Sequence, residues 1–238
     1  MDGFTYYNIF ETKGIEYLAI IAFFAILIPF WIMLSRQVKV NKQLRSKLGN
    51  LNDRMINIPQ GLFFSRNHTW THLEKSGVAK IGLDDMLLHL TGDVKVRFLK
   101  KSGELLGKGE ELAEINQDGK RLTVLSPVTG EIISSNTLID QNPEIINDDP
   151  YNRGWIYKVK PHQWVEDTSS YYLADEATNW SKKEMERFKD FLARSMSKYS
   201  ADPARVILQD GGELRDQPLA GMPAEVWKDF QHAFLEFE

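Results

Sequence analysis

Between residues 61 and 161 the chain consists of short runs of alternating polar and apolar residues, mostly separated by glycine-containing turn signals. Alternation with a period of two is typical of strands that bury one face, because successive side chains point to opposite faces of a sheet. The apolar spacing changes at residues 83–90, where we expect a short helix. Strands are expected at residues 78–83, 93–99, 121–125, 130–135 and 155–161. The pattern predicts a small, mainly β domain.

Four segments of this region resemble, in order and spacing, the H protein of the glycine cleavage system. They are His68–Trp70 and residues 77–99, 126–136 and 142–161, and the most specific run among them is Asp149–Trp155. The resemblance implies a lipoyl-domain-like fold, a barrel-sandwich hybrid in which two small sheets pack around one core. It also implies a protein whose lipoyl arm takes an aminomethyl group from one enzyme and presents it to the next.

The lysine that carries lipoate in this family lies at a hairpin tip, in the pattern Glu-Ser-x-Lys-Ala. Here two strand-like runs flank Asp118-Gly119, and counting back from Ser126 places Gly119 at the lysine position, with Lys120 one residue beyond. A shift of one residue reverses the direction of a strand side chain. Asp-Gly also favours a closed two-residue turn. We therefore expect Lys120 and Arg121 to be solvated charges on an edge strand, and we expect no cofactor, lipoate included.

No other set of residues forms a recognisable catalytic or metal site. The chain has no cysteine, which excludes thiolate catalysis, disulfides and cysteine-based metal sites. His68 and His72 are four residues apart, but their segment is expected to be a strand, and His68 matches a structural His-x-Trp pattern of the family. The pairs Asp84-Asp85 and Asp148-Asp149 suit capping and turns better than acid–base catalysis. We predict a protein that is not an enzyme and binds no metal.

Near the N-terminus, residues 17–34 form an uncharged apolar run of 18 residues. A helix of this length spans roughly 27 Å, close to the thickness of a hydrocarbon core. Basic residues follow the run, so the positive-inside rule places the N-terminus outside, and a cleaved signal peptide would need the opposite charge order. We predict a short extracytoplasmic N-terminus (residues 1–16), a transmembrane helix (15–35) in a bacterial inner (cell) membrane and a basic helical linker (36–60), with the remainder cytoplasmic.

After the predicted β domain of residues 61–164, residues 165–238 form an extension that the family's H proteins lack. A capping box at Ser181–Glu184 predicts the start of an amphipathic helix, and Pro223 predicts the start of a last helix. Their apolar faces either pack on the β domain or contact another protein, and the sequence leaves both alternatives open. The candidate partner-binding residues are Met185, Phe188, Trp227, Phe230 and Phe234.

These features predict a non-catalytic, membrane-anchored docking subunit that uses a degenerate H-protein-like domain in a membrane-bound complex, such as a respiratory or electron-transfer assembly. Its partners would be the membrane, through residues 17–34, and other protein subunits. Nucleic acid is not expected, because 33 acidic and 29 basic residues leave no basic excess. The alternative is a lipoyl carrier of one-carbon, glycine or sulfur metabolism that is lipoylated on Lys120.

Overall fold

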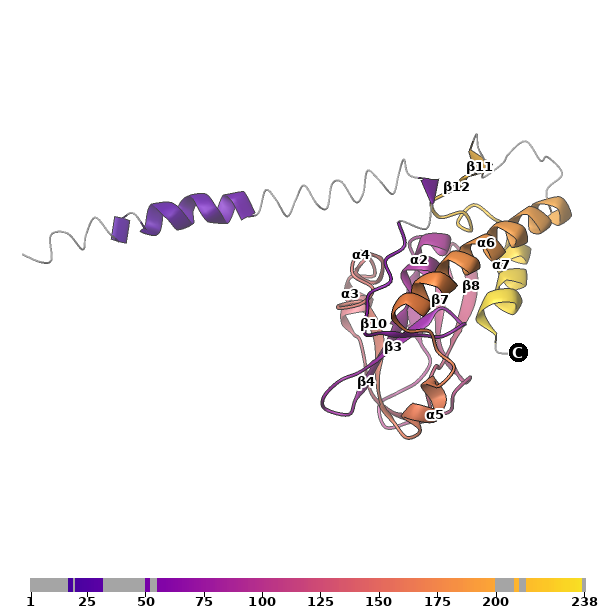
Figure 1. Cartoon of the computed structure of the whole chain (residues 1–238), viewed down its shortest axis with the longest axis horizontal. Helices are drawn as coiled ribbons and strands as arrows, with labels where there is room; N and C mark the ends of the chain where they lie inside the picture. The colour runs from indigo at the N-terminus through magenta and orange to yellow at the C-terminus, as the bar shows by residue number, and fades with distance from the viewer. Residues whose placement is uncertain are drawn as a thin grey trace, which may run out of the picture. The chain divides into compact units, whose positions relative to one another are not determined.

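The structure, a computed structural model, describes residues 17–18, 20–31, 50–51, 55–199, 208–209 and 213–236 (Figure 1). The chain divides into two compact units, Met1–Gly49 and Asn50–Glu238. The predicted extracytoplasmic N-terminus, residues 1–16, lies outside the described residues, as does most of the predicted linker over residues 36–60.

The described residues of the first unit are helical, with an unbroken stretch over residues 20–31. Within the described ranges, no helix has both the length and the apolar character that crossing a membrane requires. This finding does not support the predicted transmembrane helix over residues 15–35, part of which lies outside the described residues, and it corrects the predicted localisation in a bacterial inner membrane.

The described part of the second unit is built mainly from two antiparallel sheets (Figure 1). The first has six strands, in the order β2 (Phe63–Phe64), β3 (Thr69–Leu73), β4 (Ala79–Leu83), β10 (Trp155–Pro161), β9 (Gly130–Ser135) and β6 (Leu105–Leu106). The second has three, in the order β5 (Lys95–Phe98), β7 (Glu111–Gln117) and β8 (Lys120–Leu125). A small third sheet joins β1 (Asn50–Leu51), β12 (Glu213–Arg215) and β11 (Leu208–Gln209). The mainly β sandwich that the sequence predicts is confirmed.

The local predictions for this domain agree with the structure. All five predicted strands are present, as β4, β5, β8, β9 and β10, and the predicted short helix is α2 (Asp85–Thr91). Asp84 caps α2, because its Oδ1 accepts a hydrogen bond of 2.8 Å from the backbone N–H of Leu87. The capping role predicted for the Asp84-Asp85 pair is therefore confirmed. Further short helices are α3 (Leu138–Gln141), α4 (Ile145–Asp148) and α5 (Trp164–Thr168).

The C-terminal extension packs onto the β domain and shares its hydrophobic core. Helix α6 (Ala174–Tyr199) crosses the domain, and α7 (Ala224–Phe230) lies beside it and continues into the π-helix η1 (Gln231–Leu235) (Figure 1). The core joins apolar residues of both sheets, such as Ile81 and Leu122, to residues of these three helices. Of the two alternatives that the sequence left open, packing within the chain is the one observed.

The predicted start is close to the observed one for the last helix, α7, but not for the amphipathic helix, α6. Pro223 is the N-cap of α7, close to the predicted start. By contrast, α6 begins at Ala174 rather than at Ser181, so the predicted capping box is wrong. Ser181 is buried inside the helix, and Glu184 forms an ion pair of 2.9 Å with Arg187 instead of bonding back to a cap.

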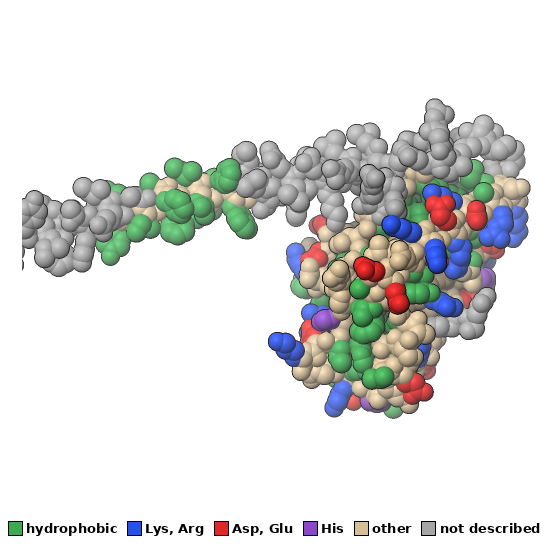
Figure 2. Space-filling view, in the orientation of Figure 1, with side chains coloured by type: hydrophobic (Ala, Val, Ile, Leu, Met, Phe, Trp, Pro, Cys, Tyr) green, Lys and Arg blue, Asp and Glu red, His purple; other side chains and the backbone are tan. Residues whose placement is uncertain are grey.

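Acidic and basic side chains are interspersed on the face of the second unit that Figure 2 shows. Between them a strip of hydrophobic side chains reaches the surface (Figure 2).

The absence of a side chain at Gly130 allows β9 and β10 to pack tightly, and Gly130 lies opposite Pro161 in this pair of strands. A Cβ at this position would lie 2.3 Å from the backbone oxygen of Lys160 and 2.8 Å from a methyl group of Val159. Because a backbone atom has to shift, we expect Gly130→Ala to lower the free energy of unfolding by about 1–3 kcal/mol, measured by urea denaturation. Gly107→Ala is the matched control, since its Cβ would meet ordinary contacts of 3.6 Å or more. Equal losses in both variants would contradict this account.

Candidate functional site

The hairpin of β7 and β8 contains Lys120 and the predicted Asp118-Gly119 turn. Gln117 and Lys120 are the last paired residues, so Asp118 and Gly119 form a two-residue turn. Both turn residues have positive φ angles, 47° and 81°, as a type I′ turn requires. The predicted closed turn is confirmed. A Cβ on Gly119 would meet no atom within 4 Å, so the tip of the hairpin is open.

Lys120, the first residue of β8, is held by residues from the C-terminal extension. Its Nζ donates hydrogen bonds to the carbonyl oxygens of Ala220, at 2.5 Å, and Met222, at 3.4 Å. It also lies 5.0 Å from the centroid of the Trp227 ring, within range of a cation–π interaction. Partial burial lowers the pKa of Lys120, and the charge of Asp118 opposes this effect. The prediction of a solvated charge is therefore wrong for Lys120.

We call residues 214–236 the C-terminal segment. Besides holding Lys120, this segment covers the outer edge of β8 through Gln231. The side-chain oxygen of Gln231 accepts a hydrogen bond of 2.7 Å from the backbone N–H of Thr123, and its amide nitrogen donates one of 3.2 Å to the carbonyl oxygen of Thr123. One glutamine side chain thus supplies the pair of bonds that a neighbouring strand would supply at this point.

The five predicted partner-binding residues are all inside the second unit. Their relative exposure lies between 0% and 2%, and three of them pack together, with ring centroids 5.9 Å apart for Phe188 and Phe230 and 4.7 Å apart for Phe230 and Phe234. The five residues are Met185, Phe188, Trp227, Phe230 and Phe234. Because this chain buries them itself, they offer no exposed surface to a partner, and the assignment is corrected.

A buried ionic cluster surrounds His68, which the sequence indicated only as a structural residue. The Nδ1 of His68 is 2.9 Å from a carboxylate oxygen of Asp84, and its Nε2 is 3.6 Å from an oxygen of Glu184. Burial by itself would lower the pKa of His68, but the hydrogen bond to Asp84 and the charges of Asp84 and Glu184 outweigh burial and raise the pKa to about 10. His68 is therefore a cation at neutral pH. It links α2 to α6.

His72 does not join this cluster. Its Nδ1 lies 3.2 Å from the carbonyl oxygen of Gly61 at an exposed position. The two histidines that share a metal-like spacing in sequence thus have separate partners, because they lie on and beside a strand rather than on one face of a helix.

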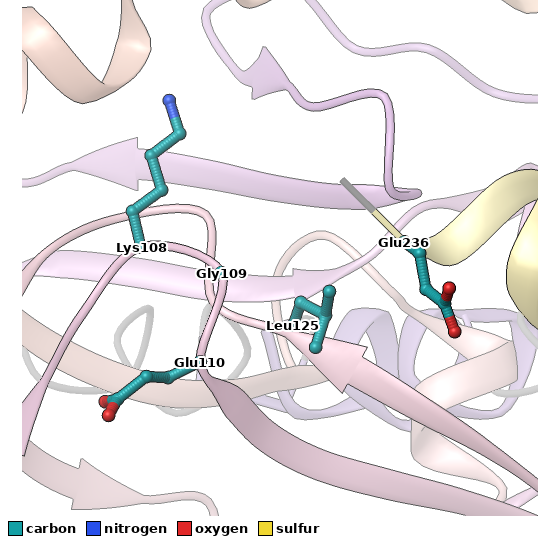
Figure 3. Close-up of a pocket in the computed structure, with 5 residues that line it drawn as sticks. All are labelled: Lys108, Gly109, Glu110, Leu125 and Glu236. Atoms are coloured by element: carbon teal, nitrogen blue, oxygen red, sulfur yellow. The ribbon is translucent and has the colours of Figure 1, made fainter. Parts of the chain in front are cut away.

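An open pocket of about 480 Å³ lies at the other end of β8, lined by Lys108, Gly109, Glu110, Leu125 and Glu236 (Figure 3). The side chains of Lys108 and Glu110 point in different directions rather than converging (Figure 3). Lys108 donates a hydrogen bond of 2.5 Å to the carbonyl oxygen of Asp167, and Glu110 accepts one of 2.8 Å from the backbone N–H of Gly107. A small-molecule site needs convergent polar groups, so this pocket does not qualify as one.

Comparison with known proteins gives the family. Residues 62–184 match the family model described as glycine cleavage H-protein. This chain belongs to that family. The glycine cleavage system H protein of Psychrobacter cryohalolentis is 33% identical over 125 residues, which cover 52% of this chain and 98% of the relative. That of Marinobacter nauticus is 36% identical over 106 residues, covering 44% of this chain and 82% of the relative.

Among solved structures, the crystal structure of an H protein from Mycobacterium marinum matches with 24% sequence identity and a TM-score of 0.46. It covers 52% of this chain and 98% of the matched chain.

The expectation that the chain has no cofactor is corrected by its family, because lipoate is the group that H proteins carry. Lys120 directly follows the turn, and the tip beside it is open. In the observed conformation, however, its amine is occupied by the carbonyl groups of Ala220 and Met222. The assignment of Gly119 to the family's lysine position remains a prediction.

The buried cluster predicts how stability depends on pH. A pKa raised from 6.5 to about 10 on folding means that the stabilisation by His68 is complete below pH 6.5 and is lost as the pH rises toward 10. We expect the free energy of unfolding to fall across this window by up to about 1.4 kcal/mol per pH unit. His68→Asn, which tolerates the positive φ of 57° at this position, should be less stable and should lack this slope.

Urea denaturation between pH 6.5 and 9.5 measures this difference in slope. His72→Asn is the control, because it removes an exposed histidine from the same hairpin and should keep the wild-type slope. If wild type and His68→Asn lost stability in parallel over this range, the cationic state of His68 would be ruled out.

Proposed function

We propose that this protein is a lipoyl carrier of the glycine cleavage H-protein family, and that Lys120 is the amine to which lipoate is attached. The observation that carries the proposal is the place of Lys120, directly after the type I′ turn of the β7–β8 hairpin and within the matched residues 62–184. The relatives are named as H proteins of the glycine cleavage system, so the proposed partners are enzyme subunits that exchange a one-carbon group through a carrier.

The residues of this chain would hold the carrier group rather than catalyse its reactions. The nucleophile in the attachment is the neutral amine of Lys120, which forms an amide bond with the lipoate carboxyl carbon while the activating group leaves and the amine loses a proton. A lowered pKa increases the neutral fraction at a given pH. Once attached, lipoate supplies a reducible dithiolane that can carry a group between enzymes. The hairpin ladder between β7 and β8 holds the attachment point at a defined position.

Two of the features that favoured a membrane-anchored docking subunit find no support in the structure. No described helix can cross a membrane, and the apolar side chains assigned to a partner are buried within the chain. What remains of that prediction is the coarser statement that the protein is a non-catalytic member of a family that works with other proteins.

The proposal predicts a lipoyl adduct on Lys120. We expect the intact mass of the full chain, produced together with a lipoate-attaching enzyme and lipoate, to include a lipoylated species. Lys120→Arg should abolish the adduct, because a guanidinium forms no such amide under these conditions. Lys101→Arg, at an exposed lysine, is the matched control and should keep it. An unmodified wild-type chain, or an adduct that survives in Lys120→Arg, would refute the assignment.

A further inference from the structure

We propose that the C-terminal segment is a built-in competitor for the amine of Lys120, which withholds this lysine from acylation while the segment binds it. This inference rests on the proposed function, whose attachment site it regulates. It also concerns residues outside the part of the chain that matches the family, since the match ends at residue 184.

The contacts around Nζ form a site for an ammonium group. Two carbonyl oxygens, of Ala220 and Met222, accept its hydrogen bonds, and the ring of Trp227 presents an aromatic face at 5.0 Å. An ammonium group has three N–H donors and a full charge, which suit two acceptors and an aromatic face. We call these three groups the amine cradle.

An acylated lysine does not fit the amine cradle. Its nitrogen keeps one N–H donor and no charge, so it can satisfy only one of the two carbonyl groups and loses the cation–π interaction. The acyl chain would also need the space that Ala220 and Met222 occupy beside the nitrogen. Binding in the cradle and acylation therefore exclude each other.

The amine cradle is anchored to the rest of the domain at several points. The indole N–H of Trp227 donates a hydrogen bond of 2.8 Å to the carbonyl oxygen of Leu219, which fixes the ring beneath the turn that supplies the two carbonyl groups. The backbone N–H of Leu219 in turn bonds to the carbonyl oxygen of Leu90 in α2, at 3.0 Å. Gln231 attaches the far end of the segment to β8. These hydrogen bonds fix the position of the amine cradle relative to the β domain.

Chemical acetylation of the folded, full-length chain tests the inference without lipoate. The chain is treated with limiting N-hydroxysuccinimidyl acetate, and peptide mass spectrometry follows the rates at Lys120 and at the exposed Lys101. We expect Lys120 to react on the order of tenfold more slowly, because it is available only when released. The lowered pKa of Lys120 would by itself speed its reaction. A slower rate would therefore show that the contacts of the amine cradle protect Lys120.

Trp227→Phe is the informative variant, because it removes the hydrogen bond to Leu219 and weakens the cation–π interaction while keeping an aromatic ring in the core. It should bring the rate at Lys120 several-fold closer to that at Lys101. Lys228→Gln, at an exposed position of α7, should change neither rate. If thermal denaturation shows that Trp227→Phe does not fold, Gln231→Ala takes its place with the same expectation.

Two results would overturn the inference: Lys120 reacting as fast as Lys101 in the wild type, or a folded cradle variant with an unchanged rate at Lys120. Lipoylation separates this failure from failure of the proposed function. If Lys120 is protected from acetylation but no variant accepts lipoate, the competitor stands and the carrier role fails. If Lys120 accepts lipoate and also acetylates freely, the carrier role stands and the competitor fails.

Discussion

The position of the C-terminal segment depends on the burial of aromatic side chains from α6, α7 and η1 against the β domain. Phe188, Phe230 and Phe234 are fully or almost fully buried, and burying one such side chain contributes about 1.5–3 kcal/mol. A hydrogen bond from a charged group contributes about 1.5–3 kcal/mol at most sites, and less at a partly exposed one such as Lys120. The aromatic contacts therefore hold the segment in place. Release of the amine can be a local event that leaves the segment docked.

A second set of contacts ties the segment to the interior of the domain. Asp84, His68, Glu184 and Arg187 form a continuous series of ionic contacts, from the N-cap of α2 to the surface of α6. Arg187 then donates a hydrogen bond to the carbonyl oxygen of Ala233 in η1 and lies 4.1 Å from the ring centroid of Phe234. Breaking a buried ion pair by removing one partner costs about 3–5 kcal/mol. The cationic state of His68 thus supports the helix against which the segment packs.

Sequence reasoning succeeded where the signal is local and failed where it depends on distant residues. Alternating polarity predicted the strands, and Asp118-Gly119 predicted the turn, because both patterns reflect backbone geometry over a few residues. The Ser181 capping box was a valid local signal that tertiary burial overrode. The amine cradle could not be predicted, since its acceptors lie 100 and 102 residues from Lys120 and are backbone carbonyl groups, which have no sequence signature. The apolar helix faces were recognised, but polarity alone does not distinguish burial within the chain from contact with a partner.

The register of the β7–β8 hairpin determines whether the C-terminal segment can reach the amine that is proposed to carry lipoate. Lys120 is paired with Gln117, and paired residues project to the same face of an antiparallel ladder. On that face Lys120 reaches the amine cradle, whereas a side chain on Gly119 would extend into open space. A lysine at the tip would be free of the segment, and a lysine one residue later is held by it. The single-residue displacement thus has a physical consequence in this fold, because it places the only amine adjoining the turn among the described residues under the influence of the C-terminal segment.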